Sequence, residues 1–240
     1  MQHRSSRESP AGASHETSTL FTAMSPRSDK VIVLRRLLAE RFPATRPPAA
    51  RRVVATGVAP IDARLGGGLA TGALTELVSL VPSAGNQLAL GSMLAATREA
   101  CQRVALIDAA GTFDLEGFDD DSLAHLVWVR CGSLAESWRA VDLAARDPNY
   151  RVVVLDLRGF SVRELQRTRD AVWVRLQRAA EQADTALAVQ TTAAVVPNAG
   201  ARLLFPEPLA DDAFLHPRTD LCTDVVVERQ RFRIVHEAVG

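Results

Sequence analysis

Apolar residues along this chain follow the two periodicities of a mixed α/β protein. Short apolar runs, typical of buried parallel strands, alternate with segments whose apolar residues recur every three to four positions, typical of helices on a sheet. Parallel strands joined by helices favour an open, doubly wound, mostly parallel sheet flanked by helices. The predicted strands are 74–80, 103–108, 124–130, 151–157, 185–190 and 224–228, with 230–236 as a hairpin partner for the last. The predicted helices are 87–102, 134–146 and 161–183.

The first 52 residues have a different pattern from the rest of the chain. Residues 1–28 are mostly polar and have no apolar period, which predicts a disordered tail. Residues 29–52 are predicted to form an amphipathic helix, begun by Asp29 and stopped by Pro43, followed by a stiff linker rich in Pro and Arg. A core domain is expected over residues 53–240. The candidate partner-binding residues on the apolar face of the helix are Val31, Leu34, Leu38 and Phe42.

Composition narrows the class of protein. The 240 residues are 47% apolar, which suits one α/β domain, and a formal net charge of zero gives no global attraction to nucleic acid or membranes. The three cysteines, Cys101, Cys131 and Cys222, are scattered, so neither a zinc site nor a disulfide is predicted. No apolar run approaches the ~18 residues of a membrane span, and the N-terminus lacks a signal-peptide core. We therefore expect a cytoplasmic protein.

The segment between the first strand and the first helix of the core has the position of a nucleotide-binding loop. A P-loop reads G-x-x-x-x-G-K-[ST]: its amides cradle phosphates, the Lys neutralises them and the hydroxyl ligates Mg²⁺. Residues 80–87 read L-V-P-S-A-G-N-Q, so Gly85 is kept while Asn86 replaces the Lys and Gln87 the hydroxyl. Loss of one charge-assisted contact removes roughly 1.5–3 kcal/mol of binding. Nucleotide binding is not expected here, and no metal or other cofactor is predicted.

Residues 56–78, just before this loop, resemble the corresponding segment of RecA-type recombinases. The segment has T-G at a turn, I-D-x-x-L at 61–65 on a short helix, and G-G-G-L-x-x-G at 66–72 before the strand. The glycines permit the positive φ angles of tight turns. The resemblance implies a RecA-like core, with a generic strand–turn–helix unit as the alternative.

Two further strand ends partly match chemical positions of RecA-type proteins. The strand ending in Asp156 resembles a Walker B strand, whose carboxylate orients Mg²⁺; without the P-loop hydroxyl, we expect Asp156 to cap the next turn. The strand ending in Asp108 resembles I-D-A-E-x-x-x-D, in which the Glu polarises the attacking water. Ala110 stands at that Glu position, and Asp108 and Asp114 are expected to serve turns. No catalytic residue is therefore predicted.

The segments that bind DNA in recombinases are reduced here. The first DNA loop is missing, because Asp156 runs almost directly into the helix predicted from 161. The second, at 191–218, holds more acids than arginines, and Gln190 before it stands at the switch Gln of recombinases, where we expect it to cap the strand end. The long helix has a basic side that is either a solvated face or a weak contact for DNA or an acidic partner. Its arginines are Arg158, Arg163, Arg167, Arg169, Arg175 and Arg178.

Together, residues 30–200 resemble the ImuA (SulA/RecA-like) family of bacterial mutasome accessory proteins. That family has a RecA-type core with a degenerate P-loop and is associated with damage-inducible translesion synthesis. It works beside an inactive Y-family polymerase and an error-prone replicative-type polymerase. The resemblance implies a non-catalytic protein that binds RecA recombinase and the mutasome polymerases through protein–protein contacts. Its effect on recombination is expected to be inhibition.

The N-terminal helix supplies a mechanism for this expectation. In recombinase filaments, the N-terminal helix of one subunit docks on the core of its neighbour, so this helix is expected to bind a RecA protomer and to cap or disrupt the filament. Burying its four apolar side chains would supply about 1.5–3 kcal/mol each. In the alternative, the helix packs on its own core. Two other functions stay open: an ATP-binding subunit with an unconventional nucleotide site, and a DNA-binding RecA-like subunit.

Overall fold

The chain is built on a seven-stranded sheet with the strand order β5-β4-β6-β7-β3-β8-β9. The computed structural model describes residues 51–109, 111–215 and 225–231. Neighbouring strands of the sheet are parallel, except that β9 is antiparallel to β8. The prediction of a RecA-like, mostly parallel α/β fold is confirmed. The predicted tail, the helix and most of the linker lie outside the described residues.

The bounds of the elements are as follows. The sheet consists of β3 (Ala73–Ser79), β4 (Arg103–Asp108), β5 (Leu126–Arg130), β6 (Tyr150–Asp156), β7 (Ala186–Thr191), β8 (Ala201–Phe205) and β9 (Val226–Gln230). Two short strands, β1 (Val53–Val54) and β2 (Leu69–Ala70), pair separately. The helices are α2 (Ala59–Leu65), α3 (Asn86–Glu99), α4 (Asp120–Leu123), α5 (Leu134–Arg146), α6 (Val162–Gln166), α7 (Asp170–Ala183) and the 3-10 helix η2 (Asp211–Leu215).

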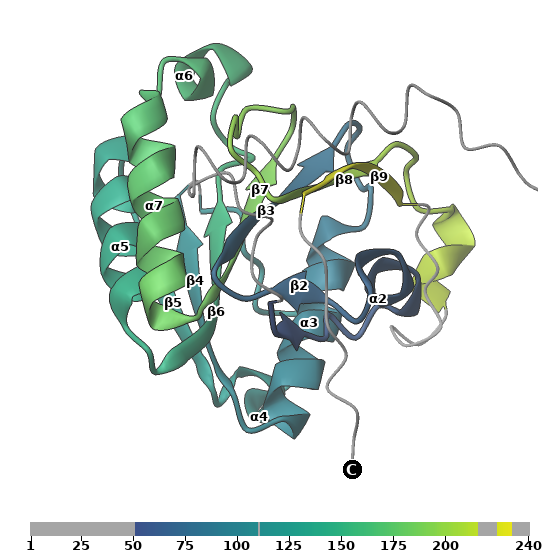
Figure 1. Ribbon diagram of the computed structural model, residues 1–240. Helices are drawn as coiled ribbons and strands as arrows, with labels where there is room; N and C mark the ends of the chain where they lie inside the picture. The colour runs from purple at the N-terminus through teal and green to yellow at the C-terminus, as the bar shows by residue number, and fades with distance from the viewer. Residues whose placement is uncertain (1–50, 110, 216–224, 232–240) are drawn as a thin grey trace, which may run out of the picture. The chain divides into compact units, whose positions relative to one another are not determined.

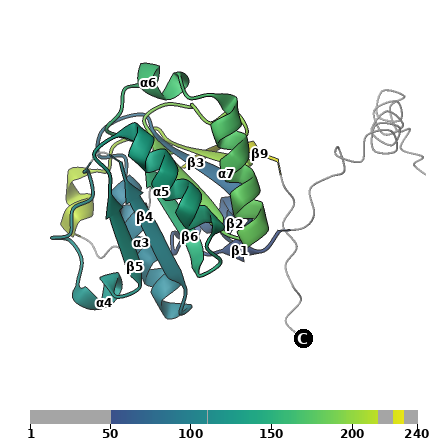
Figure 2. The ribbon, with the colours of Figure 1, turned by 90° about the vertical axis from the view of Figure 1, so that its left-hand side faces the viewer.

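Helices cover both faces of the sheet. Helices α5 and α7 pack against each other on one face, and α2 and α3 lie on the other (Figures 1 and 2). Successive strand residues point to opposite faces. In β6, Val152 and Val154 join the apolar core with α2 and α3, while Val153 and Leu155 join the core with α5 and α7. The central strands are therefore buried on both sides, as their continuous apolar runs predicted.

The helix predicted over 161–183 is two helices, so that prediction was wrong. Helix α6 begins with a capping box, in which Ser161 and Glu164 bond to each other's backbone N–H. After it, Arg169 has an extended backbone (φ −65°, ψ 141°) and precedes the first residue of α7. The break at 167–169 contains neither Gly nor Pro, and therefore carries no sequence signal of the usual kind.

The segment 191–218, predicted as a loop, contains β8 and η2. Strand β8 pairs with β3 on one side and with β9 on the other. The hairpin partner expected for the last strand at 230–236 stays a prediction. Residues 232–236 lie outside the described part of the chain. Strand β8 escaped prediction because Arg202 interrupts its apolar run. The buried guanidinium of Arg202 forms an ion pair with Glu76 of β3. It also donates hydrogen bonds to Glu228 of β9 at 2.8 Å and to the carbonyl of Val196 at 2.9 Å.

The segment before the nucleotide-loop position folds as its resemblance implied. Asp62 of the short helix α2 holds the turn in front of the helix. Its carboxylate accepts hydrogen bonds from the backbone N–H (2.9 Å) and hydroxyl (2.7 Å) of Thr56 and from the N–H of Gly57 (3.2 Å). Burial raises the pKa of Asp62, and these hydrogen bonds partly offset the rise. Position 68 requires glycine for two reasons. Its φ is 135°, and a Cβ there would lie 2.0 Å from the carbonyl oxygen of Val54.

The last two residues of the predicted linker are attached to the core. Arg51 donates to Glu181 at 2.8 Å, and Arg52 forms an ion pair with Asp184. Burial alone would raise the pKa of Asp184, but hydrogen bonds from Thr71 and Arg151, with the charges of Arg151 and Arg52, outweigh it and lower the pKa. These contacts fix the beginning of the described chain to the core. Within the described ranges, no helix has both the length and the apolar character to cross a bilayer.

Candidate functional site

The degenerate nucleotide loop joins β3 to α3 at the carboxyl-terminal edge of the sheet, where ligands bind in doubly wound folds. Gly85 is left-handed (φ 94°) and precedes the helix, and Ser83 is also left-handed (φ 56°). Asn86 and Gln87 are the first two residues of α3. The structure thus places these predicted site residues in the strand–loop–helix arrangement that the spacing implied.

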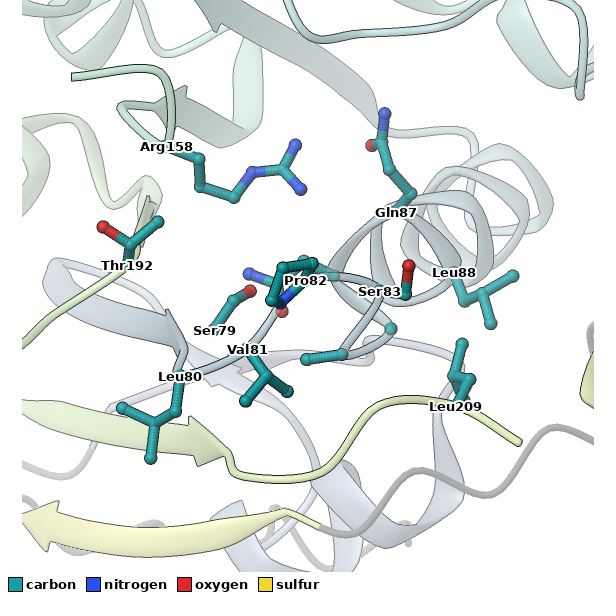
Figure 3. Close-up of a pocket in the computed structure, with 13 residues that line it drawn as sticks. Ser79, Leu80, Val81, Pro82, Ser83, Gln87, Leu88, Arg158, Thr192 and Leu209 are labelled. Carbon is teal, nitrogen blue, oxygen red and sulfur yellow. The ribbon is translucent and has the colours of Figure 1, made fainter. Parts of the chain in front are cut away.

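A pocket of about 600 Å³ surrounds this loop (Figure 3). Besides loop residues from Ser79 to Leu88, it is lined by Arg158, Thr192 and Leu209. Figure 3 shows Arg158 reaching toward the beginning of α3. Leu209 donates its backbone N–H to the carbonyl of Ser83 at 2.9 Å, so the segment after β8 is fastened to the loop.

Asn86 occupies the position of the P-loop lysine but does not point a charge into the pocket. Asn86 is among the residues around the pocket; it is 2% exposed, and both of its amide atoms are buried and have no hydrogen-bond partner among the described residues. A lysine would supply a positive charge to phosphates here, whereas the amide supplies none.

Gln87, Thr112, Asp156 and Arg158 form a continuous network, which we call the Asp156 network. Gln87 donates its amide to the carbonyl of Thr112 at 3.2 Å, and the Thr112 hydroxyl donates to Asp156 Oδ2 at 2.7 Å. Arg158 donates from its backbone (3.1 Å) and from Nε (2.9 Å) to Asp156 Oδ1, and from Nη2 to Oδ2. The P-loop hydroxyl position, the β4 turn and the Walker B position are therefore joined directly.

The Asp156 network leaves little room for a metal ion at the Walker B position. Both carboxylate oxygens of Asp156 already accept hydrogen bonds, and Arg158 places a positive charge where Mg²⁺ would carry its own. Asp156 is 1% exposed, so the pair is well shielded from water. The expectation that Asp156 caps the following turn is confirmed by the backbone bond from Arg158.

Asp108 at the end of β4 and Asp114 in the loop after it serve turns, as predicted. Asp108 accepts from the backbone N–H of Thr112 (3.0 Å) and Phe113 (3.4 Å), and from the indole N–H of Trp128 (3.2 Å). Asp114 accepts from the N–H of Glu116 at 3.0 Å. Ala110, which stands at the position of the water-polarising Glu, lies outside the described residues.

Gln190 does not cap its strand, so that prediction was wrong. It lies near the end of β7 beside Asp156 of β6, is fully buried, and has no partner for either side-chain amide atom in the described part of the chain. The strand end is instead closed by the backbone, since Leu157 donates its N–H to the carbonyl of Gln190 at 2.9 Å.

Sequence reasoning missed two residues of this site, Arg158 and Thr112. Arg158 was grouped with the helix arginines, but it lies before α6 and lines the pocket. An Arg two residues after a strand-end Asp, at a turn, was the available signal. Thr112 carried no signal, because its partner Asp156 is 44 residues away.

The remaining candidate residues are not part of this site. Val31, Leu34, Leu38 and Phe42, the predicted partner-binding face, lie outside the described residues. On α6 and α7 the arginines are exposed, and Arg175 pairs with Asp142 of α5 at 3.2 Å. Neither the family models nor the curated proteins compared with this sequence gave a match.

Proposed function

We propose that this chain is a non-catalytic RecA-like accessory protein of the DNA damage response and translesion mutagenesis. The observation that carries the proposal is the ion pair of Arg158 with Asp156, the carboxylate that would orient Mg²⁺ in a Walker B strand. Asn86 supplies no charge to phosphates and Gln87 no hydroxyl to a metal. The phosphate-binding cation and the metal-binding hydroxyl of a P-loop are therefore replaced here, and the carboxylate of Asp156 is engaged by Arg158.

The energetics support a loss of ATP chemistry. To bind Mg²⁺ through Asp156, the protein would first break a buried ion pair, which costs about 3–5 kcal/mol when one partner is left unpaired. It would also lack the lysine contact, worth roughly 1.5–3 kcal/mol. Both terms oppose the binding of Mg-ATP at this loop. We therefore infer that the protein acts through contacts of its surface with other proteins rather than through ATP hydrolysis.

The partners in this proposal come from the resemblance to the ImuA family. They are RecA recombinase, the inactive Y-family polymerase and the error-prone polymerase of the mutasome, met in the cytoplasm. The N-terminal helix docks on a RecA protomer through its apolar face, and the recombinase filament is capped or disrupted. Modulation then takes place without hydrolysis.

Calorimetric titration with Mg-ATP tests the non-catalytic part. The wild-type chain is expected to give no measurable heat of binding and no phosphate release above background. Asp156→Asn serves as the matched control, because it removes the carboxylate but keeps the side-chain shape. Tight Mg-ATP binding, or turnover that disappears in Asp156→Asn, would overturn the proposal.

Recombinase binding tests the partner, with full-length variants. Leu34→Ser with Leu38→Ser removes apolar contacts from the helix, and Arg35→Ser with Arg36→Ser changes the polar side of the same helix as a control. The first pair is expected to weaken binding to immobilised RecA by at least about 100-fold, from two buried leucines at about 1.5 kcal/mol each. The control pair should change it little. Equal binding by both variants would rule out helix docking.

A DNA-binding role is a second candidate, favoured by the exposed arginines of α6 and α7. Arg163 of α6, Arg167 and Arg169 of the break between the helices, and Arg178 of α7 are exposed. Phosphate contacts by such residues make affinity fall steeply with salt. Single-stranded DNA binding that weakens strongly with added salt, and that is lost in Arg163→Ala with Arg167→Ala, would support this candidate over the first.

A further inference from the structure

Strand β5 forms one edge of the seven-stranded sheet, and within the described residues no strand pairs with its outer side. On its inner side it bonds to β4: the carbonyl of His125 accepts at 3.2 Å, and the N–H of Cys131 donates at 3.0 Å. Backbone hydrogen-bonding groups point alternately to the two sides of a strand. The outward groups are therefore the N–H and C=O of Leu126, Trp128 and Arg130.

The sequence of β5 has few of the features that keep sheet edges apart. Natural edge strands are blocked by lysines, prolines, bulges or a covering segment. Strand β5 reads L-V-W-V-R, so it contains neither Lys nor Pro, and it pairs with β4 without a bulge. Its one charged residue, Arg130, stands at its end. An edge of strand-forming residues with free hydrogen-bonding groups is a template for a further strand.

Exposed apolar side chains lie beside this edge on the face of the sheet covered by α5. Val129 packs on the core with α5, and Val127, two residues earlier, is on the same face and 40% exposed. Helix α5 lies on the β5 side of α7 (Figure 2), and its Leu143 is 71% exposed. A partner covering this edge would remove apolar surface from water.

A second copy of β5 matches this edge by symmetry. In an antiparallel pair of β5 strands with a two-fold axis at Trp128, Leu126 of each copy lies opposite Arg130 of the other. The outward residues then meet only one another, and each pair exchanges both of its N–H···O bonds. Between these pairs Val127 lies opposite Val129 of the other copy, and such β-branched apolar pairs stabilise sheets.

The charges at the two ends of β5 are complementary in the same arrangement. At one end Arg130 is exposed, with its guanidinium carbon 5.0 Å from the centroid of the Trp128 ring. The other end follows α4, whose first turn holds the exposed Asp120 and Asp121 (Figure 2). Antiparallel pairing brings the Arg130 end of each copy beside the α4 end of the other. The attraction therefore acts twice, which favours a second copy of this chain as the partner.

We propose that this protein forms a two-fold symmetric dimer through β5, in which the two sheets join into one continuous sheet. A single pair of strands lies at the small end of the range of interfaces, so the dissociation constant is expected on the order of 10 μM. The two strands run in opposite directions. The carboxyl-terminal edges of the two sheets, with their degenerate nucleotide loops, therefore face opposite ways.

Sedimentation velocity of the full-length chain tests the association. The mass should rise from 25.9 kDa toward twice that value as the concentration increases from about 1 to about 100 μM. Amide exchange measured by NMR on the ¹⁵N-labelled chain then locates the interface. Exchange at Leu126, Trp128 and Arg130 should slow as the concentration rises. Val127 and Val129, whose N–H groups face β4, should be protected at every concentration.

Two lysine substitutions separate this edge from the rest of the surface. Val127→Lys places a charge opposite Val129 of the other copy and should weaken dimerisation at least about tenfold. Val174→Lys is the matched control, because Val174 of α7 is 41% exposed and Val127 is 40% exposed. The control should dimerise as the wild type does. Cooperative urea unfolding of both variants checks that each is folded.

A wild type that stays monomeric at about 100 μM would overturn the proposal. A dimer in which amide exchange at β5 does not slow, or equal dimerisation of the two lysine variants, would overturn it as well. The proposal depends neither on a recombinase partner nor on the state of the nucleotide loop. Its failure would therefore leave the Mg-ATP and RecA experiments unaffected.

Discussion

Arg202 of β8 forms an ion pair with Glu76 of β3, and both side chains are almost completely buried. The same guanidinium also reaches Glu228, whose side chain is 45% exposed. Glu76 further accepts from the backbone N–H groups of Val195 (2.7 Å) and Val196 (3.0 Å). One buried carboxylate therefore fixes both the neighbouring strand and the loop that leads into it.

The two carboxylates of Arg202 should differ greatly in their effect on stability. Glu76→Gln leaves a buried guanidinium without its main counter-charge and should lower the free energy of unfolding by about 3–5 kcal/mol. Glu228→Gln removes a partner that water can replace and should cost less than about 1 kcal/mol. Urea denaturation of both variants measures the difference. Similar losses for the two would contradict a special role of the buried pair.

The glycine segment before the nucleotide-loop position gives a second pair of substitutions. Gly68→Ala places a Cβ 2.0 Å from the carbonyl oxygen of Val54, so the backbone must move. A loss of more than about 3 kcal/mol is expected. Gly111 also has a positive φ, of 68°, but its Cβ would meet nothing within 4 Å. Gly111→Ala should therefore cost only about 1–2 kcal/mol, from backbone strain alone.

The Asp156 network is open to a double-mutant cycle. Arg158→Met leaves a buried carboxylate with Thr112 as its remaining side-chain donor and should cost about 3–5 kcal/mol. In the Asp156→Asn background the same substitution should cost less, and the difference, the coupling energy, should be about 0.5–3 kcal/mol. Thermal or urea unfolding of the four proteins gives this value. The exposed pair of Arg98 with Asp121 is the comparison, and its coupling should be far smaller.

His125 makes stability depend on pH. Its Nε2 lies 2.9 Å from the Thr97 hydroxyl, which itself donates to a helix carbonyl of α3. Burial first, and the charge of Arg98 second, lower the pKa of His125 from 6.5. The unfolded chain therefore binds the proton at a higher pH than the folded chain does. The contribution of His125 is fully present above about pH 6.5 and falls as the pH drops through the folded pKa.

Unfolding measured at about pH 7.5 and about pH 5.5 checks this sign. The wild type should lose stability at the lower pH, with a slope from this residue of at most about 1.4 kcal/mol per pH unit. His125→Gln keeps a donor to Thr97 but cannot titrate, so this part of the slope should disappear. An unchanged slope in the variant would assign the effect to other groups.

The regular elements with strong local signals could be predicted from the sequence. Strand β4 and helix α5 match their predicted bounds, because an apolar run ends in Asp108 and a capping Ser133 precedes an amphipathic segment. Strand β8 could not be predicted, since Arg202 is compatible with a buried strand only when Glu76 lies beside it. That neighbour comes from a strand 126 residues away in sequence.

The site was predictable in position but not in its contacts. The spacing of the degenerate motif located Gly85, Asn86 and Gln87 at the turn between strand and helix. It could not show that Thr112 bridges Gln87 and Asp156, or that Arg158 turns back onto the carboxylate. These contacts depend on how three separate strand ends meet at one edge of the sheet.

The bond between Arg158 and Asp156 also has a consequence for timing in the cell. A motor protein changes shape as its fuel is bound, split and released. Here the Arg158 side chain, which belongs to the chain itself, engages the carboxylate of Asp156. On the proposed function, the surfaces around it should look the same in a starved and in a well-fed cell, so that the amount of protein made, rather than the ratio of ATP to ADP, would set how much of it can act.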